Sequence, residues 1–198
     1  MDLAKTVRAG KSVPARIALA TAFASPLVHL LNGLPSITHL WGSVSGIGKS
    51  VGLKLAASVW ANPEIGRYIK TTKATEVAME QQAAFCGNLP MIMDELQLIQ
   101  NNKDFDRIIY SICEGSGKSR GSKYGGLQTQ THWCNTILTS GEQPITTANS
   151  KAGAVNRVIE VECSEKLFDD PRKVSQIVDN NYGFAGKRFV QILAGVDG

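Results

Sequence analysis

Short apolar runs alternate along the chain with longer segments in which apolar residues recur every three or four positions. The runs have the length of buried strands, and the longer segments have the periodicity of helices. The predicted strands are 37–41, 68–72, 89–93, 133–139 and 157–162; the predicted helices are 15–31, 49–60, 74–85 and 105–113, and a mainly helical tail starts at Asp170-Pro171. Strands interleaved with helices predict an α/β fold, with a mainly parallel sheet of about five strands between helices.

The composition fits one globular domain. The 198 residues are 43% hydrophobic and 19% charged, and 21 Lys and Arg against 17 Asp and Glu give a net charge of +4. This mild excess permits a polyanionic partner without requiring one. The four cysteines show no metal-ligand spacing, so we interpret them as buried free thiols of a reducing compartment, which predicts a cytoplasmic protein. They are Cys86, Cys113, Cys134 and Cys163.

The N-terminal segment admits two interpretations. Basic residues between Lys5 and Arg16 precede a short apolar run at 17–24, an outline that a secretory signal shares. However, Val13-Pro14 interrupts the basic region, and apolar residues continue to Leu31. We therefore favour a helix that packs on the domain, and we expect no membrane span because no apolar stretch is long enough.

A loop of small residues joins the predicted strand 37–41 to the helix 49–60, and it ends in Gly48-Lys49-Ser50. Backbone N–H groups of such a loop can face phosphate oxygens, Lys49 can reach the β- and γ-phosphates, and the Ser50 hydroxyl can bind Mg²⁺. The first glycine of the usual motif lies one residue early, at Gly42, so either Ser43 tolerates the turn or the loop is one residue longer. The expected nucleotide contacts are Gly42, Ser43, Val44, Ser45, Gly46, Ile47, Gly48, Lys49, Ser50 and Val51.

An acidic pair follows the apolar strand 89–93. A triphosphate site needs an acid at a neighbouring strand end to hold Mg²⁺, and Asp94 is the expected carboxylate. Glu95 is then placed to polarise the attacking water as a general base. The two elements together predict that the chain binds ATP and Mg²⁺. The three histidines share no spacing, so no further metal site is expected.

The segment 115–119, GSGKS, also looks like the end of a phosphate loop. A helical pattern precedes it, where a phosphate loop needs a strand, and no carboxylate pair ends the strand that follows. We therefore reject it as a nucleotide site.

Six ordered segments resemble one family. They are HLWGSVSGIGKSVGLKLAASVW, NLPMIMDELQ, EGSGKSR, ILTSGE, GAVNRVIEVE and NYGFAG, between about Ser36 and Gly186. They resemble AAA+ P-loop ATPases, specifically the helicase-like domain of phage and mobile-element replication proteins known as domain of unknown function 927, which is similar to superfamily 3 helicases. The resemblance implies an N-terminal helical segment at 1–35, a P-loop NTPase core at 36–163 and a helical tail or lid at 164–198.

The resemblance also implies roles at two further strands. The strand 135–139 would be a sensor strand between the Asp94 strand and the phosphate-loop strand, and Thr139 or Ser140 at its tip would orient the attacking water. Arg157 would reach the γ-phosphate bound by a neighbouring subunit, with Lys151 as the alternative. That role requires a homo-oligomer, expected to be a hexameric ring.

By the same resemblance, the segment 117–126 corresponds to a hairpin that touches single-stranded DNA in the pore of a ring. Lys118, Arg120 and Lys123, set among glycines, suit a loop that binds phosphates. A solvated basic loop is the alternative interpretation. Lys187 and Arg188 in the tail are weaker candidates for a second nucleotide sensor.

The leading hypothesis is a Mg²⁺-dependent ATPase that forms a ring and moves along single-stranded DNA in phage or mobile-element replication, with a primase or another replication protein as a partner. An ATP-gated assembly or loading factor that does not translocate is the alternative. A small-molecule P-loop kinase is the third hypothesis. Glu95 beside Asp94 favours hydrolysis over transfer.

Overall fold

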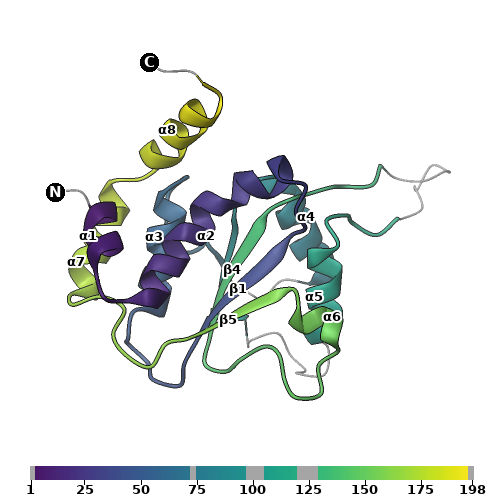
Figure 1. The fold of residues 1–198 in the computed structure, drawn as a ribbon, viewed down its shortest axis with the longest axis horizontal. Coiled ribbons are helices and arrows are strands. Elements are labelled where there is room, and N and C mark those ends of the chain that lie inside the picture. The colour runs from purple at the N-terminus through teal and green to yellow at the C-terminus, as the bar shows by residue number, and fades with distance from the viewer. Residues whose placement is uncertain (1–2, 72–74, 97–104, 120–128, 196–198) are drawn as a thin grey trace.

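A single parallel sheet forms the centre of the molecule (Figure 1). The computed structural model describes residues 3–71, 75–96, 105–119 and 129–195. Within these residues the sheet has five strands in the order β2-β3-β4-β1-β5, and every neighbouring pair is parallel. The strands are β1 (Ser36–Trp41), β2 (Lys70–Thr71), β3 (Met91–Asp94), β4 (Thr136–Gly141) and β5 (Val158–Glu162). The predicted α/β fold is confirmed, and β4 lies between β3 and β1 as the resemblance implied.

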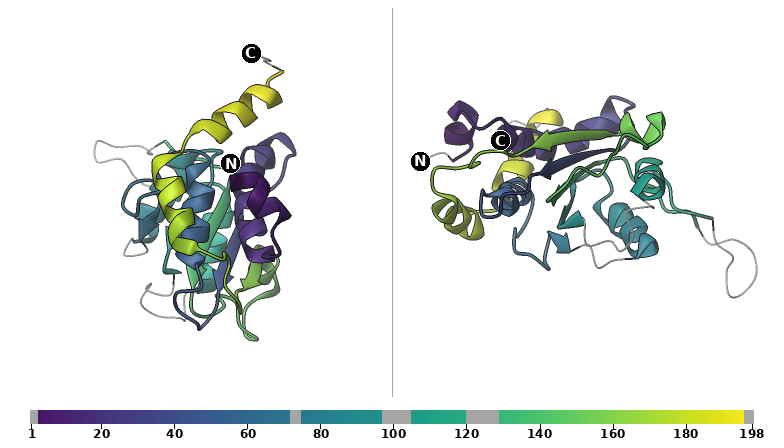
Figure 2. Two further views of the ribbon diagram at one scale, coloured as in Figure 1. Left: turned by 90° about the vertical axis from the view of Figure 1, so that its left-hand side faces the viewer. Right: turned by 90° about the horizontal axis from the view of Figure 1, so that it is seen from below.

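Helices cover both faces of the sheet (Figures 1 and 2). In the described residues they are α1 (Leu3–Ala9), α2 (Val13–Leu30), α3 (Lys49–Ser58), α4 (Glu76–Cys86), α5 (Phe105–Cys113), α6 (Ala152–Val155), α7 (Pro171–Asn180) and α8 (Phe184–Leu193). Successive side chains of a strand point to opposite faces. In β4, Leu138 therefore joins the core under α2, α3 and α7, whereas Ile137 joins the core under α4 and α5.

The N-terminal helix α2 packs on the sheet. The buried face of α2 carries only small side chains, so the helix packs closely on the strands, and three hydrogen bonds hold it in place. Thr136 donates from its backbone N to Ser25 Oγ at 3.0 Å and from Oγ1 to Thr21 O at 3.0 Å, and Trp60 Nε1 donates to Ala22 O at 3.0 Å. Among the described residues α2 is the one helix long and apolar enough to cross a membrane, a property that core helices share. The observed packing agrees with the interpretation of this segment as a helix of the domain.

The four cysteines are free thiols, of which Cys113 and Cys163 are buried and Cys86 and Cys134 are partly exposed. The prediction of buried thiols is thus correct for two of the four. Burial raises the pKa of Cys113 to about 12 and that of Cys163 to about 11. Both buried thiols are therefore protonated at neutral pH.

As far as it is described, to residue 195, the C-terminal tail contains two helices, α7 and α8. Asp170 caps α7 by accepting a hydrogen bond from Lys173 N at 3.0 Å, and Lys54 of α3 pairs with Asp179 at 3.0 Å. The start of α8 docks where Gly186 N donates to Val59 O at 2.8 Å, and Trp60 leaves no room for a side chain at Gly186. Farther along α8, the Phe189 ring packs edge-on against the Phe23 ring of α2 with the centroids 5.1 Å apart, and the C-terminal end of α8 projects from the body of the domain (Figure 2). The division at residues 35 and 163 stays a prediction.

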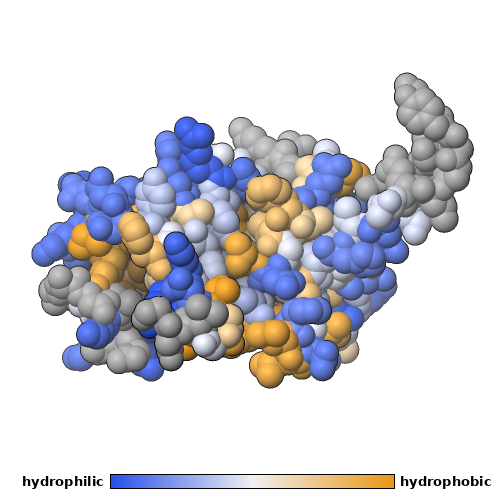
Figure 3. All heavy atoms as spheres, turned by 90° about the horizontal axis from the view of Figure 1, so that it is seen from above, coloured by the Kyte–Doolittle hydropathy of each residue, from blue (hydrophilic) through white to orange (hydrophobic). Residues whose placement is uncertain are grey.

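The molecular surface is mixed in character. Figure 3 shows hydrophobic patches between hydrophilic ones on the face seen from above Figure 1. Exposed large apolar side chains include Phe85 and Phe184, which are 85% and 78% exposed.

Candidate functional site

The loop between β1 and α3 depends on two glycines in the left-handed region. Gly46 has φ 73° and Gly48 has φ 99°, a conformation that side chains with a Cβ rarely adopt. Gly48 is also the N-cap of α3, so the chain turns directly into the helix that starts at Lys49. The Phe168 ring would lie 3.3 Å from a Cβ at Gly48. The loop therefore wraps around the N-terminus of α3 with its backbone close to the helix.

Gly42 is fixed by a close approach between two backbone segments. A Cβ at this position would lie closer than 3.0 Å to the carbonyl oxygen of Cys163, which follows β5. Lys49 folds back over the loop, and its Nζ donates to Gly42 O at 2.6 Å and to Val44 O at 3.1 Å. The lysine is therefore held above the loop by carbonyl groups.

The acidic side of the site lies where β3 and β4 end. Asp94 is 6% exposed, and its Oδ1 accepts hydrogen bonds from the Ser140 hydroxyl and, at 3.1 Å, from Glu95 N. Glu95 N also lies 3.3 Å from Ser140 Oγ. Glu95 itself has φ 58°, an unusual conformation for a residue with a side chain. Strained backbone of this kind clusters at functional sites.

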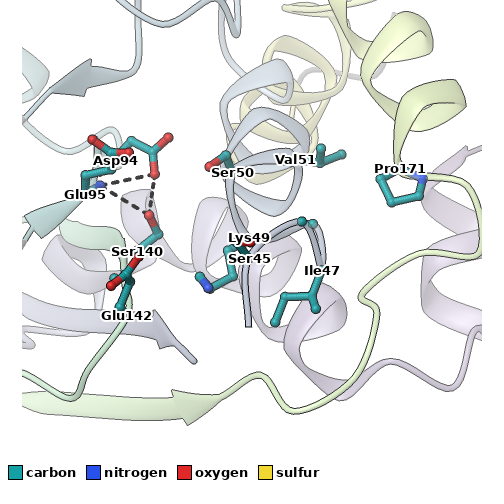
Figure 4. A pocket seen from close by; sticks show the side chains of 13 residues that line it. Ser45, Ile47, Lys49, Ser50, Val51, Asp94, Glu95, Ser140, Glu142 and Pro171 are labelled. Carbon is teal, nitrogen blue, oxygen red and sulfur yellow. Dashed lines mark hydrogen bonds between the residues drawn. The ribbon is translucent and has the colours of Figure 1, made fainter. Parts of the chain in front are cut away.

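These two sides face one cleft of about 280 Å³. Figure 4 shows Asp94, Glu95 and Ser140 on one side and Lys49 and Ser50 on the other. The lining residues are Ser45, Gly46, Ile47, Gly48, Lys49, Ser50, Val51, Asp94, Glu95, Ser140, Gly141, Glu142 and Pro171. Segments far apart in sequence therefore combine a helix N-terminus, a lysine and carboxylates, the groups that a triphosphate and its metal ion need.

Most of the loop residues expected to contact phosphate line this cleft, but three do not. Ser45 through Val51 form its wall, whereas Gly42 is buried against Cys163, and Ser43 and Val44 are exposed outside it. Gly42 directly follows β1, and its N donates to Gly141 O at 3.3 Å, so the residue extends the pairing between β1 and β4. A loop that is one residue longer than the usual motif, with Gly42 as its first glycine, stays a prediction.

Thr139 does not reach the cleft. Its hydroxyl lies 2.7 Å from His39 Nδ1, on the face of the sheet opposite Ser140. The expectation that Thr139 orients the attacking water therefore fails on geometry, and Ser140, the alternative at the strand tip, contacts Asp94 instead. The strand ends at Gly141, beyond the predicted end at 139, and this places Ser140 beside β3.

The sequence analysis missed a row of three polar side chains on neighbouring strands, His39, Thr139 and Glu160, of which His39 and Thr139 are fully buried. His39 pairs in register with Thr139 on one side and with Glu160 on the other. His39 Nε2 lies 3.0 Å from Gln143 O, which can only accept, so Nε2 carries the proton and Nδ1 accepts from Thr139. Burial lowers the pKa of His39, which keeps the ring neutral.

The same row fixes the loop that leaves the cleft. Glu160 Oε1 accepts from Ile145 N, Thr146 N and Thr146 Oγ1, each at 3.0 Å. His39 and Glu160 together therefore anchor residues 143–146, directly after Glu142, which lines the cleft. Interpreting His39 as structural agrees with these contacts.

Arg157 directly precedes β5, and so lies at the end of the strands opposite to the end that forms the cleft. Its Nη1 donates to Gly153 O at 2.6 Å, and its guanidinium lies 5.1 Å from the centre of the Tyr110 ring. Lys151, the alternative, is exposed at the N-cap of α6. Neither residue reaches the cleft of its own chain, so any contact with nucleotide would be made in a second copy.

The expected DNA-binding loop is described only in part, since Arg120 and Lys123 lie outside the described residues. Lys118 belongs to two short antiparallel segments, 115–119 and 129–133, which we call the stalk. In the stalk Ser116 pairs with His132, and Gly117 N donates to Thr131 O at 2.9 Å. The stalk follows α5, so the GSGKS segment has neither a preceding strand nor a following helix among the described residues. Lys187 and Arg188 are exposed on α8 and do not line the cleft.

Comparison with solved structures supports the fold. A structure described as "SCCmec type IV Cch - active helicase" matches with a TM-score of 0.73 and 21% identity, over 98% of this chain and 36% of that one. The chain thus spans about a third of the length of that helicase. NtrX from Brucella abortus in complex with ADP matches with a TM-score of 0.41 and 12% identity, over 82% of this chain and 36% of that one, which is too weak to bear on the site. No curated protein sequence matches the chain.

A family model covers more than half of the sequence. It is described as "Domain of unknown function (DUF927)", and it matches residues 6–132, which include the glycine loop, the acidic pair and the stalk. The chain belongs to the DUF927 family.

Proposed function

We propose that the protein is a Mg²⁺-dependent ATPase whose catalytic site is the cleft between α3 and β3. One observation carries the proposal: Lys49 and Ser50 at the N-terminus of α3 face Asp94 and Glu95 at the end of β3 across a single cleft. A helix N-terminus attracts phosphate through its N–H groups and its dipole. ATP and reduced thiols are both found in the cytoplasm, which is the proposed location.

The residues of the cleft fit a magnesium ion. The Ser50 hydroxyl and the Asp94 carboxylate are oxygen ligands of the kind that Mg²⁺ prefers, and both line the cleft. Bound Mg²⁺ would neutralise charge on the phosphate oxygens. Ser140 contributes by holding the Asp94 carboxylate in one orientation.

Lys49 and Glu95 would have separate roles in hydrolysis. Lys49 would exchange its contacts with Gly42 O and Val44 O for phosphate oxygens, which are stronger acceptors because they are charged. Glu95, whose position is fixed by the hydrogen bonds of its backbone N, would accept a proton from the attacking water. A base at this position favours hydrolysis over transfer to a small molecule.

Two substitutions test these assignments. Lys49→Ala is expected to weaken binding of a fluorescent ATP analogue, whereas Lys54→Ala, on the same helix but paired with Asp179, should leave it unchanged. Glu95→Gln is expected to bind ATP as the wild type does and to hydrolyse it about 100-fold more slowly, as loss of a general base predicts. Full turnover by Lys49→Ala would show that the site lies elsewhere.

We further propose that the protein acts as a ring-forming helicase or translocase on single-stranded DNA in phage or mobile-element replication. The fold shared with a helicase and the stalk that carries Lys118 support this proposal. A primase or another replication protein is the proposed partner.

The position of Arg157, away from the cleft of its own chain, is compatible with a contact in trans. If so, mixing inactive Arg157→Ala and Lys49→Ala subunits should restore part of the ATPase activity, because some mixed interfaces combine an intact lysine with an intact arginine. Mixtures that stay inactive would remove Arg157 from the site.

A further inference from the structure

The stalk is anchored to the side of the domain formed by α4 and α5 (Figures 1 and 2). Trp133 is 4% exposed and donates from Nε1 to Ile112 O of α5 at 2.7 Å, and its N donates to Gly115 O at 2.9 Å. A Cβ at Gly117 would collide with Thr131. The described part of the stalk is therefore held at a fixed place against α5.

One carboxylate on α4 binds two cations from different elements. Glu76 Oε1 accepts from Lys118 Nζ of the stalk at 2.6 Å, and Oε2 accepts from Arg107 Nη2 of α5 at 3.0 Å. The hydrogen bond from Lys118 lowers the pKa of Glu76, so the carboxylate is charged at neutral pH. Two positive charges and one negative charge leave this trio with a net charge of +1.

The exposure of the three side chains is unequal. Glu76 is only 18% exposed, whereas Arg107 is 65% and Lys118 is 57% exposed. Exposed ion pairs contribute little to folding stability, so stability alone does not account for the arrangement. In the contacts between described residues, Arg107 uses one of five N–H donors on Glu76 and Lys118 uses one of three, so both cations have further donors that suit a ligand with charged oxygens.

We propose that Arg107 and Lys118, held side by side by Glu76, bind the phosphate backbone of a single-stranded nucleic acid. The proposal adds Arg107 as a binding residue and Glu76 as the positioning residue that keeps two like charges together. It rests on the proposed action of the protein on nucleic acid. Both cations are more than half exposed and come from different elements, so they form an open surface that suits a linear polyanion better than a single phosphate ion.

Binding of a fluorescent single-stranded oligonucleotide to the full chain, measured by anisotropy over a range of KCl concentrations, tests the proposal. Arg107→Ala should weaken binding about 3- to 10-fold and lower the slope of log K against log salt by about 0.7. Glu76→Gln removes the anion that holds the two cations side by side, so it should weaken binding severalfold although the net charge of the trio rises from +1 to +2; tighter binding would show that Glu76 does not position them. Arg67→Ala is the matched control, because Arg67 is 72% exposed and pairs only loosely with Glu64 at 3.7 Å.

The outcomes separate this proposal from the proposed function. If the wild type binds the oligonucleotide and both Arg107→Ala and Glu76→Gln bind as it does, the trio lies outside the interface and the inference is wrong, while the proposed function stands. If the wild type does not bind, the action on nucleic acid fails and the inference fails with it. Potassium phosphate that displaces the oligonucleotide more strongly than KCl of equal ionic strength would show a site for free phosphate instead. Circular dichroism of each variant separates loss of binding from loss of fold.

Discussion

Gly42→Ala tests the observed course of the glycine loop. The added Cβ would lie closer than 3.0 Å to Cys163 O, which is backbone and cannot rotate away as a side chain could. Either the turn after β1 or the segment after β5 must move. Because Lys49 Nζ donates to Gly42 O at 2.6 Å, a shift of the turn also moves the lysine away from its place above the loop.

Overpacking of this kind costs about 1–3 kcal/mol. For a chain of 198 residues each kcal/mol corresponds to about 2–4 °C in Tm, so the expected loss is roughly 2–12 °C. Differential scanning calorimetry measures the Tm, and titration with a fluorescent ATP analogue measures the effect on the site. We expect weaker nucleotide binding together with the lower Tm.

Ser43→Ala is the matched control, because Ser43 is exposed in the same loop and its side chain does not line the cleft. This variant should match the wild type in both measurements. A Gly42→Ala protein with unchanged Tm and unchanged nucleotide affinity would refute the close approach between Gly42 and the Cys163 carbonyl.

Three further predictions concern the surroundings of the cleft. Ser140→Ala removes the hydrogen bond to the Asp94 carboxylate, worth about 1.5–3 kcal/mol, so the rate of hydrolysis should fall about 10- to 100-fold with little change in ATP affinity. Unchanged turnover in a steady-state ATPase assay would limit Ser140 to a structural role. His39→Leu leaves the buried Thr139 hydroxyl without its partner, at about 1–3 kcal/mol, and also removes the hydrogen bond to the carbonyl of Gln143, an exposed residue. Urea denaturation should show a loss of at least about 1 kcal/mol in the free energy of unfolding, and an unchanged value would contradict the buried contact between His39 and Thr139. The raised pKa of Cys113 (about 12) and of Cys163 (about 11) leaves little thiolate at pH 8, so iodoacetamide should modify both cysteines in urea but neither in the folded protein. Peptide mapping measures the modification, and rapid modification of the folded protein would contradict the burial of the two thiols.

The sequence predicted the strands and most helices because their periodicity is strong. Helix α5 spans the predicted residues 105–113, and β1 and β5 begin within one residue of the prediction. The periodicity predicted neither α1 nor α6 as a separate helix, since α1 has only seven residues in a basic segment and α6 has only four. Short helices depend on tertiary contacts that local sequence does not show.

Within the site, the sequence indicated which residues carry the chemistry, but not which way their side chains point. The glycine loop and the acidic pair were recognisable because their chemistry requires particular residue types at fixed places. The choice between Thr139 and Ser140 depends on which face of β4 points to the cleft, and this became certain only from the register with β1 and β3. The ion pairs of Glu76 join elements 31 and 42 residues apart, and no local pattern signals such a contact.

Steady-state ATP hydrolysis by the wild-type chain with Mg²⁺, measured with and without single-stranded DNA over a range of protein concentrations, tests the central proposal most directly. We predict hydrolysis that DNA stimulates and whose specific activity rises with protein concentration, as expected for a ring with an arginine acting in trans. Hydrolysis that is indifferent to DNA and to concentration would leave an ATPase without the translocase, and would favour an assembly factor. Absence of hydrolysis under all these conditions, in a protein shown to be folded, would contradict the proposal that the cleft between α3 and β3 is an ATPase site.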